Sequence, residues 1–219
     1  IGSSSASDVG AGMNGSMSLG YSNGDILGTG ISVNYAYYPR LDGKTNAEKK
    51  SSALENQSAD SAESINIGIP LAGLPIVGDS PLGGMKITAG YNTTDNLTEA
   101  NQRLAGGTVA VTLPVGPLSV GLQKKAYAQS QTDGTKTFYK DDVIGVAYAV
   151  NDAFAVSYNI IESDKHLETS IVEQETKAFN VAYTVGGLTL GFQDASTSNS
   201  GYTVGTDNDT RTISVKTAF

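Results

Sequence analysis

The sequence predicts an all-β fold, an antiparallel up-and-down barrel that crosses a membrane with its strands. Three observations support this prediction. Apolar and polar residues alternate along most of the 219 residues, tight turns alternate with longer polar connections, and aromatic residues flank an aliphatic middle on the apolar parity. Gly (26) and Tyr (11) are abundant while helix signals are sparse, which also favours strands.

Composition excludes several classes of protein. No apolar run approaches the roughly 18 residues that a transmembrane helix needs. Cysteine is absent, which removes disulfides, thiolate metal sites and thiol nucleophiles together. The formal net charge is -8, and most acidic residues lie between the strand patterns. Nucleic acid is therefore not expected as a partner, because phosphate binding needs clustered Lys and Arg.

About eleven strands are expected. Their apolar parities begin at Met13, Ile31, Ile65, Met85, Val109, Leu118, Phe138, Phe154, Phe179, Leu188 and Ile213. The stretch 39–62 is expected to be a long polar loop, with room for a short helix within 45–55. The last strand runs from Thr210 to Phe219, and the chain closes on the aromatic residue of its apolar face. This ending is similar to the terminal strand of Gram-negative outer-membrane barrels, where it signals membrane insertion.

The connections between these strands alternate in length. Tight tips are predicted at Asn23-Gly24, Val115-Gly116, Asn151-Asp152 and Gly186-Gly187. Longer polar connections are predicted at 39–62, 93–103, 130–136, 162–175 and 194–209, and 71–83 is an apolar exception. In a meander the two sets fall on opposite ends, which is typical of transmembrane barrels with short turns on one side and long loops on the other.

Aromatic residues of the apolar parity form two groups. Those expected near the short-turn end are Tyr21, Tyr148, Phe154, Tyr183 and Phe219. Those expected towards the long-loop end are Tyr37, Tyr91, Phe138, Phe179 and Phe192. Two aromatic belts around an aliphatic band suit a bilayer, because amphipathic rings favour the level of the headgroups. The better strands also reach about ten residues, the length that a tilted membrane span requires.

Two repeated hairpin cores complete the pattern: G-V-A-Y-A-V-N-D-A-F-A-V-S-Y at 145–158 and F-N-V-A-Y-T-V-G-G-L-T-L-G-F at 179–192. With these cores the chain resembles the general-diffusion porins of Gram-negative outer membranes over nearly its whole length. The resemblance implies a passive channel for ions and small hydrophilic solutes in the outer membrane. It also implies contact with outer-membrane lipid and lipopolysaccharide, and assembly as a homotrimer.

The odd strand number has two interpretations. The resemblance favours a single domain, 1–219, that forms the last eleven or so strands of a sixteen-stranded barrel, with residues 1–12 as the tail of the constriction loop. The alternative is a complete twelve-stranded monomeric channel. A structural or adhesive barrel that binds a partner through its surface loops is a further alternative.

The polar parity predicts which residues line the pore. They are Asn14, Asn34, Arg40, Asn66, Lys86, Asn92, Gln123, Lys125, Gln193 and Lys216. Few carboxylates share this parity, and lining charge sets the ion preference of wide pores. The hypothesis is a mildly cationic wall, and the alternative is that these lysines only hydrate the channel.

No enzyme, cofactor or metal site is predicted. The glycine pattern from Gly10 to Gly15 opens a strand, whereas a nucleotide-binding loop opens a helix. Asp141 and Asp142 have opposite parity and are expected to face apart, which makes them a poor acid and base pair. His166, the single histidine, is expected to be solvated in a charged loop, and Asp207 to Asp209 to be a solvated loop tip.

Overall fold

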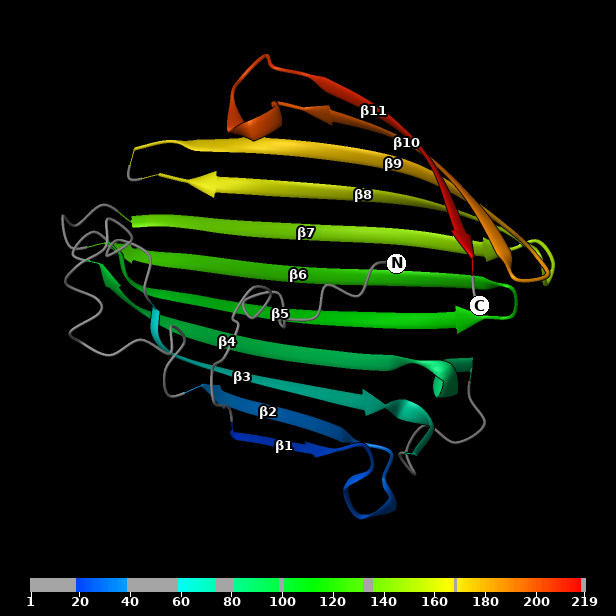
Figure 1. Cartoon of the computed structure of the whole chain (residues 1–219), viewed down its shortest axis with the longest axis horizontal. Helices are drawn as coiled ribbons and strands as arrows, with labels where there is room; N and C mark the ends of the chain where they lie inside the picture. Colours follow the sequence, from blue (N-terminus) through cyan, green and yellow to red (C-terminus); the bar gives the residue numbers. More distant parts are fainter. Residues whose placement is uncertain are drawn as a thin grey trace.

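The structure, a computed structural model, describes residues 19–38, 59–73, 81–98, 101–131, 136–167 and 169–217. These residues form one antiparallel sheet of 11 strands, in which each strand pairs with its neighbours in chain order (Figure 1). The strands are β1 (Leu19–Asn23), β2 (Ser32–Tyr38), β3 (Ala59–Pro70), β4 (Lys86–Thr98), β5 (Asn101–Val115), β6 (Leu118–Gln131), β7 (Lys136–Ala149), β8 (Phe154–His166), β9 (Ile171–Val185), β10 (Leu188–Ser198) and β11 (Asn208–Thr217). The predicted all-β meander is confirmed, and the described residues contain the eleven strands expected.

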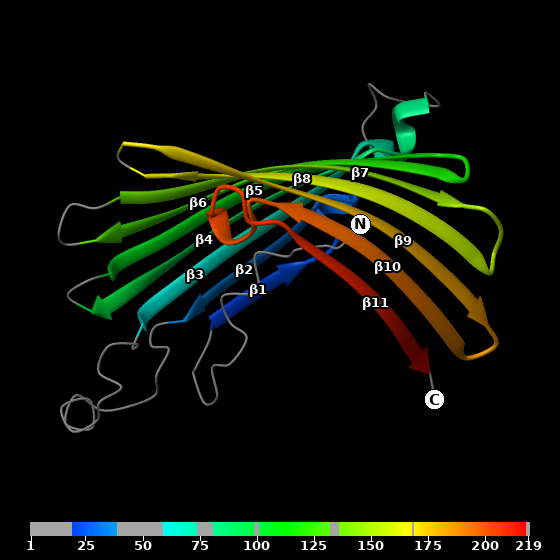
Figure 2. The same ribbon diagram turned by 90° about the horizontal axis from the view of Figure 1, so that it is seen from above.

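The sheet bends into an arch with a concave and a convex face (Figure 2). Its edges are β1 and β11, which do not pair with each other. Between strands, short 3-10 turns occur at η2 (Ile26–Gly28), η4 (Leu71–Gly73), η5 (Pro81–Gly84) and η6 (Ser200–Tyr202). Within the described ranges, no helix combines the length and the apolarity that a membrane span demands.

The register places the two parities on opposite faces. Val120 pairs with Val146, and Val146 pairs with Tyr158, so the apolar parity forms continuous cross-strand rows. The polar parity forms the rows between them. A shift of one residue would exchange the two faces, so the hydrophobic pattern itself fixes this register.

The convex face carries the apolar rows and is open to its surroundings. Among the described residues, the buried apolar side chains are Ala62, Leu71 and Ala178, and no large side chain is fully buried. By contrast, Leu122 is 50 % exposed and Ile213 is 79 % exposed. A soluble sandwich would bury such rows against a second sheet. An apolar face of this extent instead suits the hydrocarbon of a bilayer.

The strands run further than the apolar alternation predicts. β4 ends at Thr98 and β5 begins at Asn101, so most of the predicted polar connection 93–103 lies in strands. The predicted loop 162–175 is likewise mostly strand, and β3 begins within the predicted loop 39–62. The physical reason is that ladder hydrogen bonds join backbone groups, so pairing continues beyond the last apolar side chain.

The predicted division into short and long connections is therefore only partly correct. At one end the connections are 24–31, 71–85, 116–117, 150–153 and 186–187, and at the other 39–58, 99–100, 132–135, 167–170 and 199–207. The tight tip predicted at Asn23-Gly24 is wrong. There the backbone N–H of Gly30 donates to Asp25 Oδ1 over 2.6 Å, and this contact closes a wider loop.

The positions of the aromatic residues along the strands agree with the prediction better at the short-turn end than at the long-loop end. Tyr148, Phe154 and Tyr183 lie within two residues of the ends of β7, β8 and β9. Phe179 and Phe192, however, lie near the middle of β9 and β10, because these strands extend further than expected. Phe219, the segment 1–12 and the helix considered within 45–55 lie outside the described residues.

Candidate functional site

The concave face, called the concave wall below, collects the predicted lining residues. Asn34 pairs with Asn66, and the same row continues across the sheet to Lys125 and Asp141. Eight of the ten predicted residues share this face by register: Asn34, Asn66, Lys86, Asn92, Gln123, Lys125, Gln193 and Lys216. Asn14 and Arg40 lie outside the described residues.

Polar side chains on the concave wall pair across strands. Gln193 Nε2 donates to Asn180 Oδ1 over 2.9 Å, and Gln123 Nε2 donates to Thr108 Oγ1 over 2.9 Å. Ser22 donates to Asn34 Oδ1 over 2.6 Å near the β1 edge. These contacts span the wall from β1 to β10. They give the concave wall a hydrophilic surface whose side chains hold one another in place.

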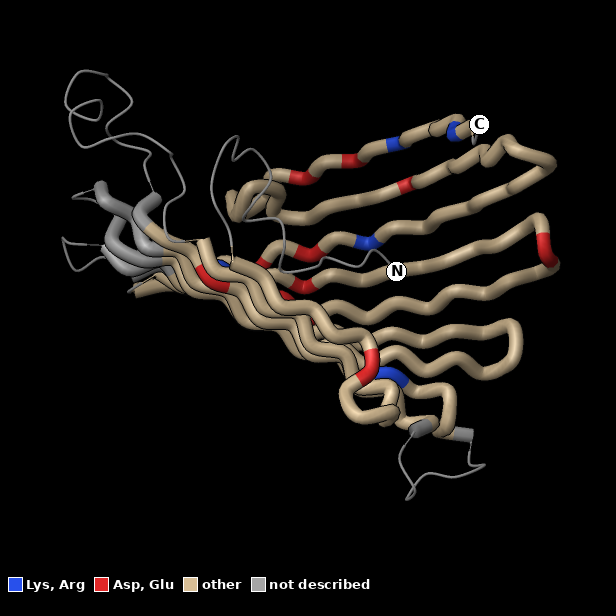
Figure 3. The backbone as a smooth tube through the Cα atoms, turned by 60° about the horizontal axis from the view of Figure 1, so that its bottom comes forward, with Lys and Arg blue, Asp and Glu red and all other residues tan. Residues whose placement is uncertain are grey.

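The charge of the concave wall is predominantly basic. Among the strand side chains that the structure describes, four lysines face inward: Lys86, Lys125, Lys165 and Lys216. Of the acidic side chains described in the strands, Asp141 lies on this face. Other carboxylates, such as Asp142 and Glu162, lie on the opposite parity. Long stretches of the strands carry no charged residue (Figure 3).

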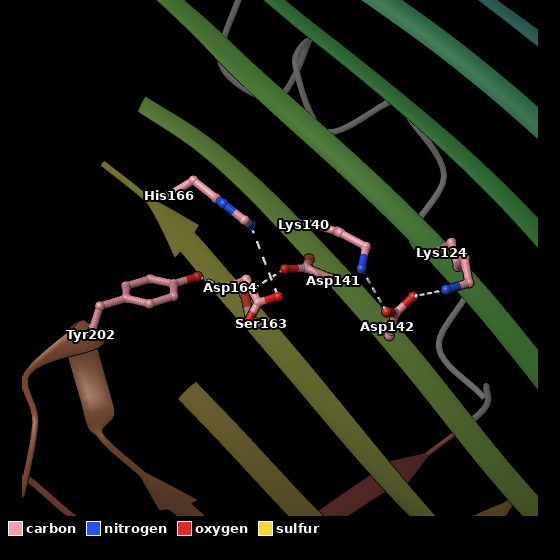
Figure 4. A network of polar contacts seen from close by, with 8 residues as sticks. All are labelled: Lys124, Lys140, Asp141, Asp142, Ser163, Asp164, His166 and Tyr202. Carbon is pink, nitrogen blue, oxygen red and sulfur yellow. Dashed lines mark hydrogen bonds and ion pairs between the residues drawn. The ribbon is translucent and has the colours of Figure 1, made fainter. Parts of the chain in front are cut away.

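A chain of polar contacts crosses the concave wall at β6 to β8, and Figure 4 shows its members Asp141, Ser163 and Tyr202. Lys125 Nζ lies 3.1 Å from Asp141 Oδ2, and Ser163 Oγ donates to Asp141 Oδ1. Ser163 Oγ is also 2.7 Å from Tyr202 Oη. Because the single hydroxyl hydrogen of Ser163 goes to Asp141, Tyr202 is the donor in the second bond. Ser163 is 5 % exposed, so the row is partly shielded from water.

Three tyrosines lie beside this polar chain. The ring centroids of Tyr127 and Tyr139 are 5.9 Å apart, and those of Tyr139 and Tyr202 are 5.4 Å apart. Lys165 Nζ lies 5.8 Å from the Tyr139 ring and 5.7 Å from the Tyr202 ring, within the range of a cation–π contact. Tyr202 reaches this cluster from the connection between β10 and β11.

The sequence analysis does not predict this cluster of polar and aromatic side chains. Tyr127 and Lys125 share the polar parity of β6, so their common face was readable. Lys165 and Tyr202, however, fall in segments predicted as polar loops. The strand character of the first and the inward course of the second depend on backbone pairing and tertiary contact. No local pattern reports either of them.

Asp142 belongs to a separate ion-pair set on the convex face. Its Oδ1 lies 2.7 Å from Lys124 Nζ, and its Oδ2 lies 3.2 Å from Lys140 Nζ. Asp141 and Asp142 therefore point to opposite faces, as their parity predicts (Figure 4). No paired acid and base can form from these two residues.

His166 also has neighbours that the sequence did not indicate. Its Nε2 lies 3.9 Å from Asp164 Oδ2, and its ring packs 5.4 Å from that of Phe138, centroid to centroid. The prediction of a solvated histidine in a loop is therefore wrong, since His166 ends β8 and is half-buried. Within the described ranges, no three acidic or histidine side chains meet in a cluster able to hold a metal ion.

Comparisons with known proteins add evidence about the fold. No family model matches the chain. No curated protein matches it either. Two solved structures of OmpT, an outer membrane protein of Vibrio cholerae, share its architecture. The in-vitro folded protein superposes with a TM-score of 0.62 at 9% identity, covering 90% of this chain and 60% of that chain. Its trimer form superposes with a TM-score of 0.59 at 10% identity, covering 90% and 61%.

The chain has the fold of the outer-membrane β-barrels, and its 11 described strands form an open arch of that architecture. The likeness to two barrels covers all but a tenth of the chain, and the sheet has the exposed apolar face that the location requires. This outer-membrane barrel chain spans about 60% of the length of the two neighbours. At 9–10% identity the likeness shows the fold and not membership of the porin family.

The comparisons correct one prediction, that the chain is not an enzyme. That exclusion is wrong. It rested on the sequence, in which no catalytic arrangement of residues was recognised, whereas the structural neighbours are outer-membrane proteins named OmpT, for which the likeness shows the barrel alone. Because one fold supports unrelated functions, an outer-membrane barrel does not by itself exclude catalysis.

Proposed function

We propose that the chain forms the wall of a water-filled channel through which ions and small hydrophilic solutes diffuse passively. One observation carries the proposal: the concave wall is mostly polar from β1 to β11, while the apolar rows face outward. A barrel with this orientation encloses water and contacts hydrocarbon. Gradients across the membrane then drive the flow, and the four inward lysines bias the channel towards anions.

The partners follow from the same orientation. The convex face contacts outer-membrane lipid, lipopolysaccharide included, and the concave wall contacts the solutes. A homotrimer is part of the proposal, supported by the trimer form described for one neighbour. Chemical cross-linking in detergent tests the assembly, and a purely monomeric product would contradict it.

Conductance in planar bilayers tests the channel. The refolded chain is expected to give stepwise conductance, and insertion without conductance would overturn the proposal. Lys125→Gln tests the role of the concave wall. It removes one inward charge and leaves Asp141 without its 3.1 Å ion pair, so the reversal potential in a salt gradient shifts towards cation preference.

Lys124 provides the matched control. It is the adjacent lysine and also pairs with an aspartate, but it lies on the convex face. Lys124→Gln is therefore expected to leave the reversal potential unchanged. Equal shifts in both variants would show that the concave wall does not line the conducting path.

A further inference from the structure

The connection 199–207 between β10 and β11, called the inner loop below, folds back onto the concave wall. Asn199 Nδ2 donates to the carbonyl of Glu173 over 2.9 Å, and the Gly201 N–H donates to Gln174 Oε1 over 2.8 Å. Tyr202 Oη lies 2.7 Å from Ser163 Oγ. The loop therefore contacts β8 and β9 instead of only continuing the hairpin. Figure 2 shows it on the inner side of the arch.

The inner loop also has a fixed internal conformation. The Gly205 N–H donates to Asn199 Oδ1 over 2.9 Å, and the Ser200 N–H donates to the Thr206 carbonyl over 2.6 Å. Asn199 and Tyr202 have φ angles of 51° and 57°, in the left-handed region. For a bulky residue such as Tyr202 this conformation is a genuine outlier, which persists where the surrounding contacts impose it.

The position of the contacts places the inner loop on the concave face of the sheet. Ser163 and Gln174 pair with each other and belong to the polar parity that contains Lys125 and Asn34. The Tyr202 ring packs on Tyr139 and lies beside Lys165, both on the same parity. The loop thus adds a second layer of chain on the concave wall and takes up part of the space on the inner side of the arch (Figure 2).

We propose that the inner loop is a fixed constriction of the channel, that it sets the size limit for solutes, and that Tyr202 holds it against the wall. The proposal rests on the proposed function. The constriction presents the exposed residues of the loop and the Lys165 ammonium to passing solutes. The ligand class is therefore small hydrophilic molecules, and the loop discriminates among them by cross-section.

A variant with a shortened inner loop and an unchanged sheet tests the constriction most directly. Thr197 pairs with Asn208, so replacing residues 199–206 with Asn-Gly joins Ser198 to Asp207 through a two-residue hairpin turn in the same register. The shortened chain is expected to show higher single-channel conductance. In liposome swelling it should also admit larger sugars than the full chain. Wild-type conductance together with a wild-type size limit would overturn the proposal.

Two point variants test whether Tyr202 holds the inner loop against the concave wall. Tyr202→Ala removes the hydrogen bond to Ser163 and the ring contact with Tyr139. This variant should admit larger sugars than the full chain, as the shortened chain does. Val204→Ala is the matched control, because Val204 is 78 % exposed in the same loop. Its conductance and size limit should equal those of the full chain. An equal effect of both substitutions would show that Tyr202 does not hold the inner loop against the wall.

A labelling experiment distinguishes failure of the constriction from failure of the channel. The chain contains no cysteine, so Lys165→Cys gives a single thiol on the wall beside Tyr202. A water-soluble maleimide should modify this thiol faster in the shortened chain than in the full chain, whether or not either conducts. Absence of conductance in the full chain would refute the proposed function. Equal labelling rates would refute the placement of the inner loop.

Discussion

At the scale of the residue, Gly186 shows how one backbone angle fixes a hairpin. It follows β9 with a φ of 57°, and nothing lies within 4 Å of where its Cβ would be. The left-handed region is costly for L-residues because Cβ approaches the following carbonyl oxygen, and the cost is about 1–2 kcal/mol. Steric crowding is absent here, so conformational strain is the whole penalty for a larger residue.

Gly186→Ala is therefore expected to lower the free energy of unfolding by about 1 kcal/mol. Gly187 is the matched control, because its φ is not among the positive values of the described residues. Gly187→Ala should leave stability nearly unchanged. Urea unfolding in lipid vesicles measures both variants. Equal losses would show that the turn does not depend on the left-handed angle of Gly186.

At the scale of the element, β7 carries an ion-pair set in an otherwise apolar row. Its outward residues between Tyr148 and Phe138 include Asp142 and Lys140, and Asp142 contacts both Lys140 and Lys124. A lysine facing lipid at the bilayer midplane costs about 2–4 kcal/mol. The carboxylate between the two ammonium groups offsets part of that cost.

Asp142→Leu is expected to destabilise the barrel by about 2–4 kcal/mol, because it leaves two ammonium groups without their shared partner. The triple change Lys124→Leu, Lys140→Leu and Asp142→Leu should recover most of the loss by making the row apolar. Unfolding in vesicles compares the variants. A single variant as stable as the unmodified chain would show that this part of β7 lies outside the hydrocarbon.

At the scale of the whole molecule, the orientation of the two faces is the central property. Val146 and Ala147 are neighbours on β7 with opposite parity, and so are Val156 and Ser157 on β8. With single cysteines in vesicles, a water-soluble maleimide should modify positions 147 and 157. Positions 146 and 156 should stay protected by lipid. Labelling without this two-residue period would contradict a barrel with a wet interior.

The sequence predicts the features that depend on local alternation of apolar and polar residues, and it misses those that depend on contacts between distant residues. The alternation of Val146, Tyr148 and Val156 follows from one face being apolar, so fold class, strand order and the face of Lys125 were predictable. The ends of β4 and β9 were not, because backbone pairing continues through polar residues. The course of the inner loop was not predictable either, because a contact between Ser163 and Tyr202 leaves no periodic trace in the chain.

The extension of the strands beyond the apolar rows has a consequence for recognition at that rim. Where β8 and β9 meet, only residues 167–170 separate two paired strands, and the backbone N–H of Leu167 donates to the carbonyl of Ser170 over 2.8 Å. A binder that approaches this rim meets two antiparallel segments at fixed spacing. An antibody raised against the folded protein would thus recognise a conformational epitope, and a linear peptide of the same residues would compete poorly for it.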